Sequence, residues 1–303
     1  MAGVRPPYAG MIGFYPNSRG ELVRAIEGCF LDERWGPGRL PEPGRLRGLE
    51  PLGGVAPHAG LAYSGPCAAH FYAWLGDTGV RPDTVVVIGT NHTGYGGIYT
   101  TATEWGEWET PLGRTPVDLE FAERLVSRYP VLEDDALAHR EEHSVEMQLI
   151  FLQYLYGADG FRLVPIVAKE ASARLAEGLA KAVHEVAAEL GRRTLVVASS
   201  DFTHHGLMYG YVVFNERVGE NVEKLDMYVI EPILRLDTRG FLSRIMETGA
   251  TVCGVGAIPV AIEYARMAGG AARLLRYYNS AQKTGDEEIA VGYASIAFYR
   301  EQR

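Results

Sequence analysis

The feature that most constrains the fold is a series of short apolar runs, rich in β-branched residues, that alternate with segments of helical spacing. The runs at residues 84–88 and 195–198 have the length and composition of buried strands. Residues 171–190 form an amphipathic helical pattern that Gly191 closes. This alternation predicts an α/β fold with a central, mostly parallel sheet flanked by helices. We expect one domain over residues 1–303, because no linker separates the loops that carry histidine.

Local signals place further elements. Ser18, with Glu21 three residues later, resembles a capping box and predicts a helix. Ser64 precedes Gly-Pro and predicts a helix that begins at Ser64 and ends near Gly76. We expect another helix to begin at residues 251–254, which include Cys253. Other helices are expected at residues 116–128, 141–155 and 237–246, and strands at 161–167, 274–278 and 291–299.

Composition excludes several classes of partner. The formal net charge is -9, and no long basic run is present, so we expect no nucleic-acid partner. No apolar stretch approaches the ~20 residues of a membrane span, and the N-terminal residues lack the apolar core of a secretory signal. Three scattered cysteines do not form a disulfide framework, and Cys29 and Cys67 fall on core faces of expected helices. We therefore expect a reduced, cytoplasmic protein without a membrane partner; its oligomeric state stays open.

Histidines follow three of the expected strands. His58 lies in Pro-His-Ala-Gly and His92 in Thr-Asn-His-Thr-Gly. The run at 195–198 leads into Asp201 and, three residues later, His204. Ligands of open α/β sheets bind at the carboxyl ends of the strands. Each histidine alone is better explained as a hydrogen-bonded turn residue, but their matching placement favours one metal-capable pocket.

The segment at residues 199–206 has the densest chemistry. A hydrogen bond from His204 to Asp201 would fix the tautomer of the ring and suit a general base. The alternative is a buried polar turn capped by Asp201. Cys253, near the expected helix start, is either an activated thiolate or a small buried hydrophobic residue.

A further polar cluster opens the helix expected at residues 141–155. It contains Glu142, His143 and Glu146, and spacing puts the last two on one helix face. It lacks the His-Glu-x-x-His zinc-protease motif, and helix-start electrostatics explains it as well as a role beside the site. The chain also lacks a Walker loop, Gly-x-Gly-x-x-Gly and Gly-x-Ser-x-Gly, which counts against nucleotide and serine-hydrolase chemistry.

Taken together, these motifs resemble the Memo family over nearly the whole chain. The resemblance rests on Pro-His-Ala-Gly at 57–60, Asn-His at 91–92, Glu-His-Ser-Val-Glu-Met-Gln at 142–148, Ser-Ser-Asp-Phe-Thr-His at 199–204 and Cys-Gly at 253–254. It implies a fold like that of class III extradiol dioxygenases, which bind non-haem Fe(II) through two histidines and a glutamate. In the Memo pattern a cysteine replaces the carboxylate. The resemblance thus implies His58, His92 and Cys253 as metal ligands, with Asp201 and His204 in the same pocket.

Around these ligands we expect supporting side chains: His143, Glu146, Asn91 and His205. Two imidazoles and a thiolate leave a coordination position open, and the thiolate shifts preference from hard Fe(II) toward Cu(I), Zn(II) or a soft iron site. The first expectation is a metal-dependent, dioxygenase-like oxidoreductase with iron or copper and a small-molecule substrate, in which His204 moves the proton. The alternatives are a non-catalytic protein that binds a peptide or metal in a vestigial pocket, and a zinc-dependent hydrolase.

Overall fold

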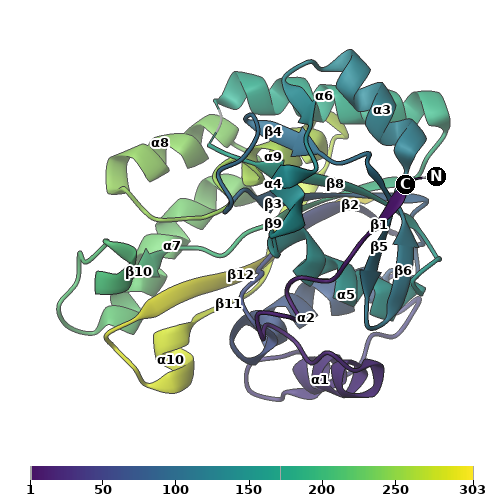
Figure 1. Cartoon of the computed structure of the whole chain (residues 1–303). Helices are drawn as coiled ribbons and strands as arrows, with labels where there is room; N and C mark the ends of the chain where they lie inside the picture. Colours follow the sequence, from purple (N-terminus) through teal and green to yellow (C-terminus); the bar gives the residue numbers. More distant parts are fainter. Residues whose placement is uncertain (1, 171, 303) are drawn as a thin grey trace.

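The computed structural model describes residues 2–170 and 172–302, which form one α/β domain with a nine-stranded sheet between two layers of helices (Figure 1). The sheet order is β10-β12-β2-β9-β3-β8-β4-β7, with β11 also paired to β12. Its centre is parallel, as predicted: β2 (Leu49–Ala56), β9 (Thr194–Ser199), β3 (Thr84–Thr90) and β8 (Arg162–Ala168). The flanks make the sheet mixed, because β12 (Ala290–Glu301) runs antiparallel to β2, and β4 (Tyr99–Thr101) runs antiparallel to β8.

The remaining strands extend these flanks or form a separate sheet. β11 (Ala271–Asn279) and β10 (His204–His205) pair antiparallel with β12, and β7 (Leu132–Asp134) pairs parallel with β4. A small second sheet joins β1 (Gly3–Arg5) to β5 (Trp105–Thr110) and β6 (Gly113–Pro116). The N-terminal strand is therefore tied to the middle of the chain.

Helices cover both faces of the central sheet (Figure 1). On one face pack α3 (Leu119–Arg128), α6 (Ala173–Leu190), α7 (Val218–Leu234), α8 (Thr238–Thr248) and α9 (Ile258–Met267). On the other face pack α1 (Arg19–Leu31), α2 (Leu61–Asp77) and α5 (Ser144–Tyr156). The shorter helices are α4 (Leu137–Arg140), the 3-10 turn η1 (Leu207–Tyr209) and α10 (Ser280–Thr284). No helix in the described ranges is long and apolar enough to cross a membrane.

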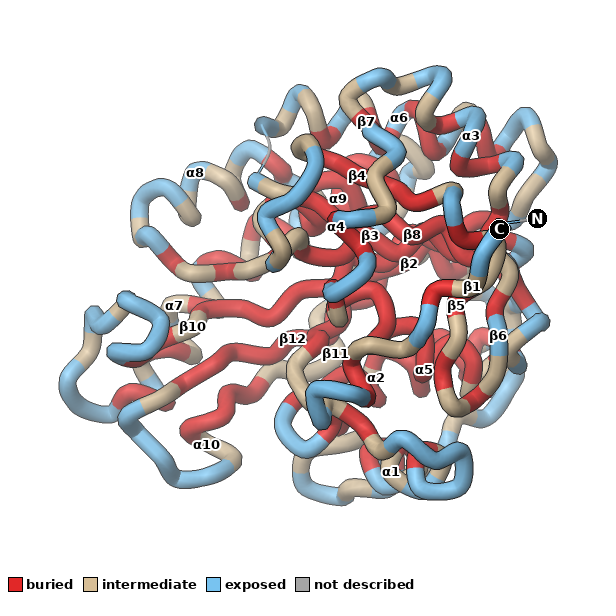
Figure 2. Tube along the Cα trace, viewed as in Figure 1, coloured by how far each residue is buried: buried red, intermediate tan, exposed pale blue. Residues whose placement is uncertain are grey.

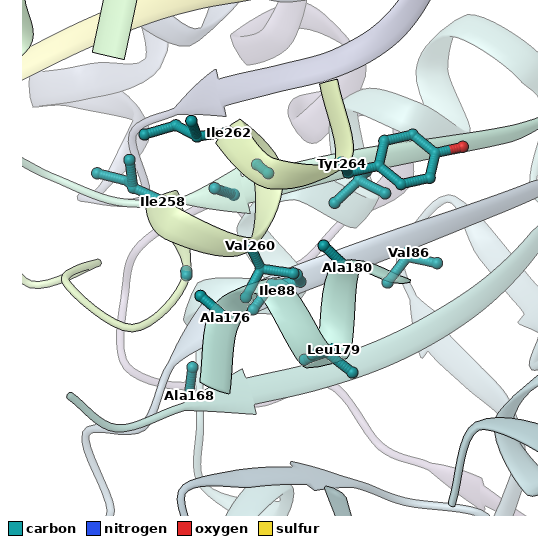
Figure 3. Close-up of a cluster of buried hydrophobic side chains, with 14 of the residues drawn as sticks. Val86, Ile88, Ala168, Ala176, Leu179, Ala180, Ile258, Val260, Ile262 and Tyr264 are labelled. Carbon is teal, nitrogen blue, oxygen red and sulfur yellow. The ribbon is translucent and has the colours of Figure 1, made fainter. Parts of the chain in front are cut away.

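The two-residue period of a strand divides the core into two layers. In β3, Val86 and Ile88 face the layer of α6 and α9, whereas Val85 and Val87 face the layer of α1, α2 and α5. Figure 3 shows Val86 and Ile88 beside small and branched side chains of α6 and α9, which allow these helices to approach the sheet. Figure 2 shows the consequence: the central strands are mostly buried, and exposed residues lie in loops, on outer helix faces and on the outer strands such as β7 and β11.

Several helix boundaries differ from those predicted. Ser18 caps α1 as expected, its side chain accepting a hydrogen bond from the Glu21 amide. However, α2 begins at Leu61, not Ser64, because Ser64 donates to the carbonyl oxygen of Ala59 from within the first turn. Residues 251–254 form turns rather than a helix start, and α9 begins only at Ile258.

Four further helices differ from the prediction in where they begin, or were not predicted. Helix α3 begins at Leu119, since Pro116 belongs to β6, and α5 begins at Ser144. Helix α6 runs from Ala173 to its Gly191 cap, while residue 171, the predicted start, lies outside the described residues. Helix α7 was not predicted, because the aromatic residues before it gave no clear period.

Candidate metal centre

The candidate site lies at the carboxyl ends of three adjacent parallel strands. His58 follows the end of β2 by two residues, His92 follows β3 by two, and Asp201 follows β9 by two. Because β9 pairs with both β2 and β3, these three loops emerge side by side. The predicted meeting of the three loops at this sheet edge is therefore observed.

Three imidazoles gather at this edge. One ligand nitrogen each from His58, His92 and His143 lies within 4.8 Å of the others. The ring centres of His58 and His92 are 5.2 Å apart, and the rings of His92 and His143 stack at 4.7 Å. The group could hold a metal ion, and it includes His143, which the sequence placed only among the supporting residues.

Ser199 fixes the orientation of His58. Its hydroxyl donates to the carbonyl oxygen of Ser144 at 2.7 Å and accepts from the Gln148 amide at 2.8 Å. The single hydroxyl hydrogen is thus committed, and Ser199 Oγ must accept from His58 Nδ1 at 3.0 Å. His58 Nδ1 therefore carries a hydrogen, which assigns Nε2 as the metal-binding atom.

Glu142 fixes His92 in the same sense. Its carboxylate accepts from His92 Nδ1 at 2.9 Å and from the His92 amide at 2.7 Å. Burial would lower the pKa of His92, but hydrogen bonds to Cys253 and Glu142 and their negative charges raise it to about 10. Conversely, burial would raise the pKa of Glu142, and His92 lowers it to about 2. The carboxylate thus stays ionised and directs Nε2 of His92 toward Cys253.

His143 is held by an aromatic contact. It precedes α5, and the edge of the Phe14 ring lies against it with ring centres 4.7 Å apart. Burial, together with the charge of His58, lowers the pKa of His143 to about 3. His143 is therefore a neutral ring near neutral pH, the form that can donate a lone pair to a metal.

Cys253 completes the group. Its Sγ lies 3.3 Å from His58 Nε2 and accepts a hydrogen bond from the Asp201 amide at 3.1 Å. Burial would raise the pKa of the thiol, but the charge of His58 and hydrogen bonds from His58 and His92 lower it to about 6. The thiolate is thus stabilised by imidazoles, not by a helix N-terminus as the sequence suggested, because α9 begins five residues later.

Asp201 and His204 both line the pocket but do not hydrogen-bond to each other as predicted. Asp201 Oδ1 accepts from the backbone amides of His58 and Ala59, so the carboxylate fixes the His58 loop. His204 Nδ1 lies 2.9 Å from the carbonyl oxygen of Phe202 and 3.1 Å from that of Thr251. Because both partners are acceptors, Nδ1 carries the hydrogen and Nε2 is left as a base.

The other expected supporting residues have different roles. Glu146 is fully buried in an ion pair with Arg5, and it also accepts hydrogen bonds from Tyr15 and from the amides of Tyr8 and Ala9. It therefore anchors the N-terminal segment rather than a histidine. Asn91 bonds within its own turn, accepting from Gly94 and donating to Tyr95.

His205 does not support the histidine cluster. Its Nε2 accepts from the amides of Val213 and Phe214, and its ring stacks on Phe214 at 5.7 Å. Adjacent residues of a strand point to opposite faces, so only His204 of this pair faces the pocket. The sequence could not choose between the two rings.

The histidines open into a cavity of about 790 Å³ whose wall includes His58, His92, His143, Asp201 and His204. Aromatic and apolar side chains complete it, among them Phe14, Tyr63, Tyr209 and Tyr293. A second cavity of about 520 Å³ shares Ile12, His92 and His143 with the first. The cluster is thus accessible to small molecules.

Sequence reasoning missed two residues that organise the site. The sequence indicated Ser199 only as part of the segment at residues 199–206. For the cluster that contains Glu142, the sequence allowed a helix-start charge or a role beside the site, and it did not place Glu142 among the supporting residues. The signal that could have identified Glu142 was its position directly before His143, in the motif at residues 142–148 that resembles the Memo family. No nearby residue marked Ser199 as important, because its hydrogen-bond partners are far away in the sequence. Gln148 and Ser144 are 51 and 55 residues away, and His58 is 141 residues away.

The residues fit a metal ion. The separation of 3.3 Å between Cys253 Sγ and His58 Nε2 suits two ligands of one ion, given metal–sulfur and metal–nitrogen bonds of about 2.3 and 2.0 Å. His58 and His92 each present Nε2 while Nδ1 is held by an acceptor, as is usual for metal-binding histidines.

Comparisons with known proteins identify the family to which the chain belongs. The family model described as Memo-like protein matches residues 5–297. A MEMO1 family protein of Methanopyrus kandleri is 42% identical to the chain, and the alignment covers 97% of the chain and 98% of that protein. A MEMO1 family protein of Desulfurococcus amylolyticus is 41% identical, and the alignment covers 94% of the chain and 96% of that protein. A MEMO1 family protein of Pyrococcus abyssi is 39% identical, and the alignment covers 97% of the chain and 99% of that protein. A solved structure of an uncharacterized protein, JW3007 from Escherichia coli K12, has a TM-score of 0.46 and 16% identity, covering 75% of this chain and 90% of that one. The chain belongs to the Memo-like family.

Proposed function

We propose that the chain is a metal-dependent redox protein that holds iron or copper at His58, His92 and Cys253. The observation that carries the proposal is the contact of 3.3 Å between Cys253 Sγ and Nε2 of His58, beside His92, whose Nδ1 is held by Glu142. A bound ion with an open coordination position would supply Lewis acidity and one-electron chemistry. The thiolate favours copper or a soft iron site over a hard ion.

The chain's own residues would bind the substrate and move a proton. The cavity receives a small molecule beside the histidines, and its aromatic wall excludes water from the apolar part of that molecule. His204 accepts a proton at Nε2, because its Nδ1 hydrogen is held by two carbonyl oxygens. Asp201 keeps the His58 loop in place.

Two ligand sets share His58 and His92 and differ in the third member, which is Cys253 or His143. We favour Cys253, since its sulfur is in contact with a ligand nitrogen and its pKa is lowered to about 6. His143 is then a neighbour that stacks on His92.

The test is metal content after anaerobic purification and reconstitution with Fe(II) or Cu(I), measured by mass spectrometry of the metal. We expect about one ion per chain in the wild-type protein and in H143A, and loss of the ion in H58A and C253A. The outcome that refutes the ligand assignment is retention in C253A with loss in H143A. Dioxygen uptake in the presence of a catechol, absent from H204Q, would support redox turnover; an uptake rate in H204Q equal to that of wild type would refute the role of His204.

A further inference from the structure

Two nearly buried polar side chains in the cavity wall have hydrogen-bonding atoms without a protein partner. Asp201 is only 3% exposed, and its Oδ1 accepts two amides. Its Oδ2 has no hydrogen-bond partner within the described part of the chain, and neither does the hydroxyl of Tyr293, which is 2% exposed. Neither atom is sealed from solvent, and both residues line the cavity, so these two atoms are open to a ligand that forms hydrogen bonds with them.

The charge of the wall indicates the sign of that ligand. Apart from tyrosines, the ionisable residues that line the cavity are four histidines, Asp201 and Asp286, and no lysine or arginine is among the described lining residues. His92, whose pKa is raised to about 10, already has its positive charge balanced by the Glu142 carboxylate. Sites for carboxylates and phosphates generally present arginine or lysine. A free carboxylate oxygen needs a hydrogen-bond donor and favours a cation.

The aromatic residues of the wall suit the same ligand. Tyr63, Tyr209 and Tyr293 all line the cavity. Burial and, next, the charge of Asp201 raise the pKa of both Tyr209 and Tyr293, which indicates that these rings lie near the carboxylate. Tyrosine faces attract organic cations, and neutral phenols can still accept a hydrogen bond.

We propose that the cavity binds an organic primary amine, whose ammonium group donates hydrogen bonds to Asp201 Oδ2 and the Tyr293 hydroxyl. The tyrosines surround the ammonium group, and the rest of the ligand extends into the cavity beside the histidines. This inference deepens the proposed function by naming the substrate class of the same pocket. The competing explanation is that Asp201 only balances the charge of a bound metal.

The test compares three probes of one shape, benzylamine, benzyl alcohol and benzoate, by calorimetric titration of chelator-treated, metal-free protein. We expect benzylamine to bind at least tenfold more tightly than the alcohol, as charge-assisted hydrogen bonds predict, and benzoate not to bind. D201N should weaken benzylamine binding by about tenfold, and Y293F by about threefold. The matched surface controls D159N and Y228F should leave it unchanged.

Equal affinity for benzylamine and benzyl alcohol would overturn the proposal, and so would full benzylamine affinity in D201N. Circular dichroism and thermal unfolding establish that D201N is folded; if it is not, the comparison of the three probes on the wild-type protein and Y293F decides. Because the titration uses metal-free protein, its result is separate from that of the metal-content measurement. Benzylamine binding that requires added metal would favour the competing explanation.

Discussion

A buried carboxylate behind the site should make the stability of this protein depend on pH. Asp226 of α7 is fully buried. Its Oδ1 accepts from the Thr203 amide at 3.1 Å, and its Oδ2 from the Tyr277 hydroxyl at 2.7 Å. Burial raises the pKa of Asp226 from 3.8 to about 6, although these hydrogen bonds act in the opposite direction. Asp226 therefore connects α7 to the segment that carries Asp201 and His204, while its burial favours the protonated form of the carboxyl group in the folded chain.

The size and sign of the effect follow from linkage. The pKa is higher in the folded than in the unfolded chain, so the folded state is favoured by protonation. The contribution of Asp226 is fully present below pH 3.8 and is lost as pH rises through about 6. A shift of about 2 pKa units corresponds to about 3 kcal/mol of unfolding free energy. The loss approaches its full and constant value about one pH unit above the folded pKa.

The assay is urea unfolding of wild-type protein and D226N at half-unit intervals from pH 4 to pH 8. Asparagine has nearly the same shape but does not titrate, so D226N should lack this part of the pH dependence. The difference in unfolding free energy between the two proteins should change by about 2.4 kcal/mol between pH 4 and pH 7 in favour of D226N, because the unfolded chain is already partly ionised at pH 4. The surface variant D159N should follow the wild-type curve.

A difference between wild type and D226N that stays constant within about 1 kcal/mol across this range would refute the reasoning. It would mean that the buried carboxylate keeps an ordinary pKa, with Thr203 and Tyr277 fully offsetting its desolvation. A change of the opposite sign would mean that the ionised form is the one stabilised by the fold.

Three other variants test separate features. E142Q should weaken metal binding about tenfold or more in a competition titration, because it removes the charge that orients His92; equal affinity in E142Q and the exposed control E141Q would contradict this. L179A should lower the unfolding free energy by about 2–5 kcal/mol in urea, since Leu179 is fully buried between α6 and the sheet; a loss below about 1 kcal/mol would show that the core relaxes around it. G53A should lower the melting temperature far more than G13A, although both glycines have positive φ. A Cβ at residue 53 would lie 1.8 Å from the Val196 carbonyl oxygen, whereas a Cβ at residue 13 would meet nothing within 4 Å. Equal melting temperatures would refute the steric argument.

The sequence was informative where the signal was local. Apolar runs of β-branched residues located the parallel strands, and Ser18 and Gly191 located helix ends correctly. The α/β class and family followed from these runs and from motifs spread along the chain. Strand ends also located His58 and His92, because parallel strands deliver their loops to one edge.

What failed depended on contacts between distant residues. Asp201 was expected to orient His204, but its Oδ1 is taken by amides 142 and 143 residues away. Cys253 was expected at a helix start, yet its thiolate depends on two histidines from other loops. Glu146 has the spacing of a site residue, but it faces Arg5 and the N-terminal segment instead. One-dimensional spacing gives the face of a helix, not the partner that will cover it.

The tether between Glu146 and the N-terminal segment has a consequence for the order of events during synthesis. Phe14, which packs on His143, belongs to a loop whose two ends, at Ala9 and Tyr15, are both fastened to one carboxylate more than 130 residues later. Residues 8–15 therefore acquire their final positions only after α5 has been synthesised. Because Tyr293 of β12 also lines the cavity, the pocket stays unfinished, and ligand capture has to wait, until that strand has been translated as well.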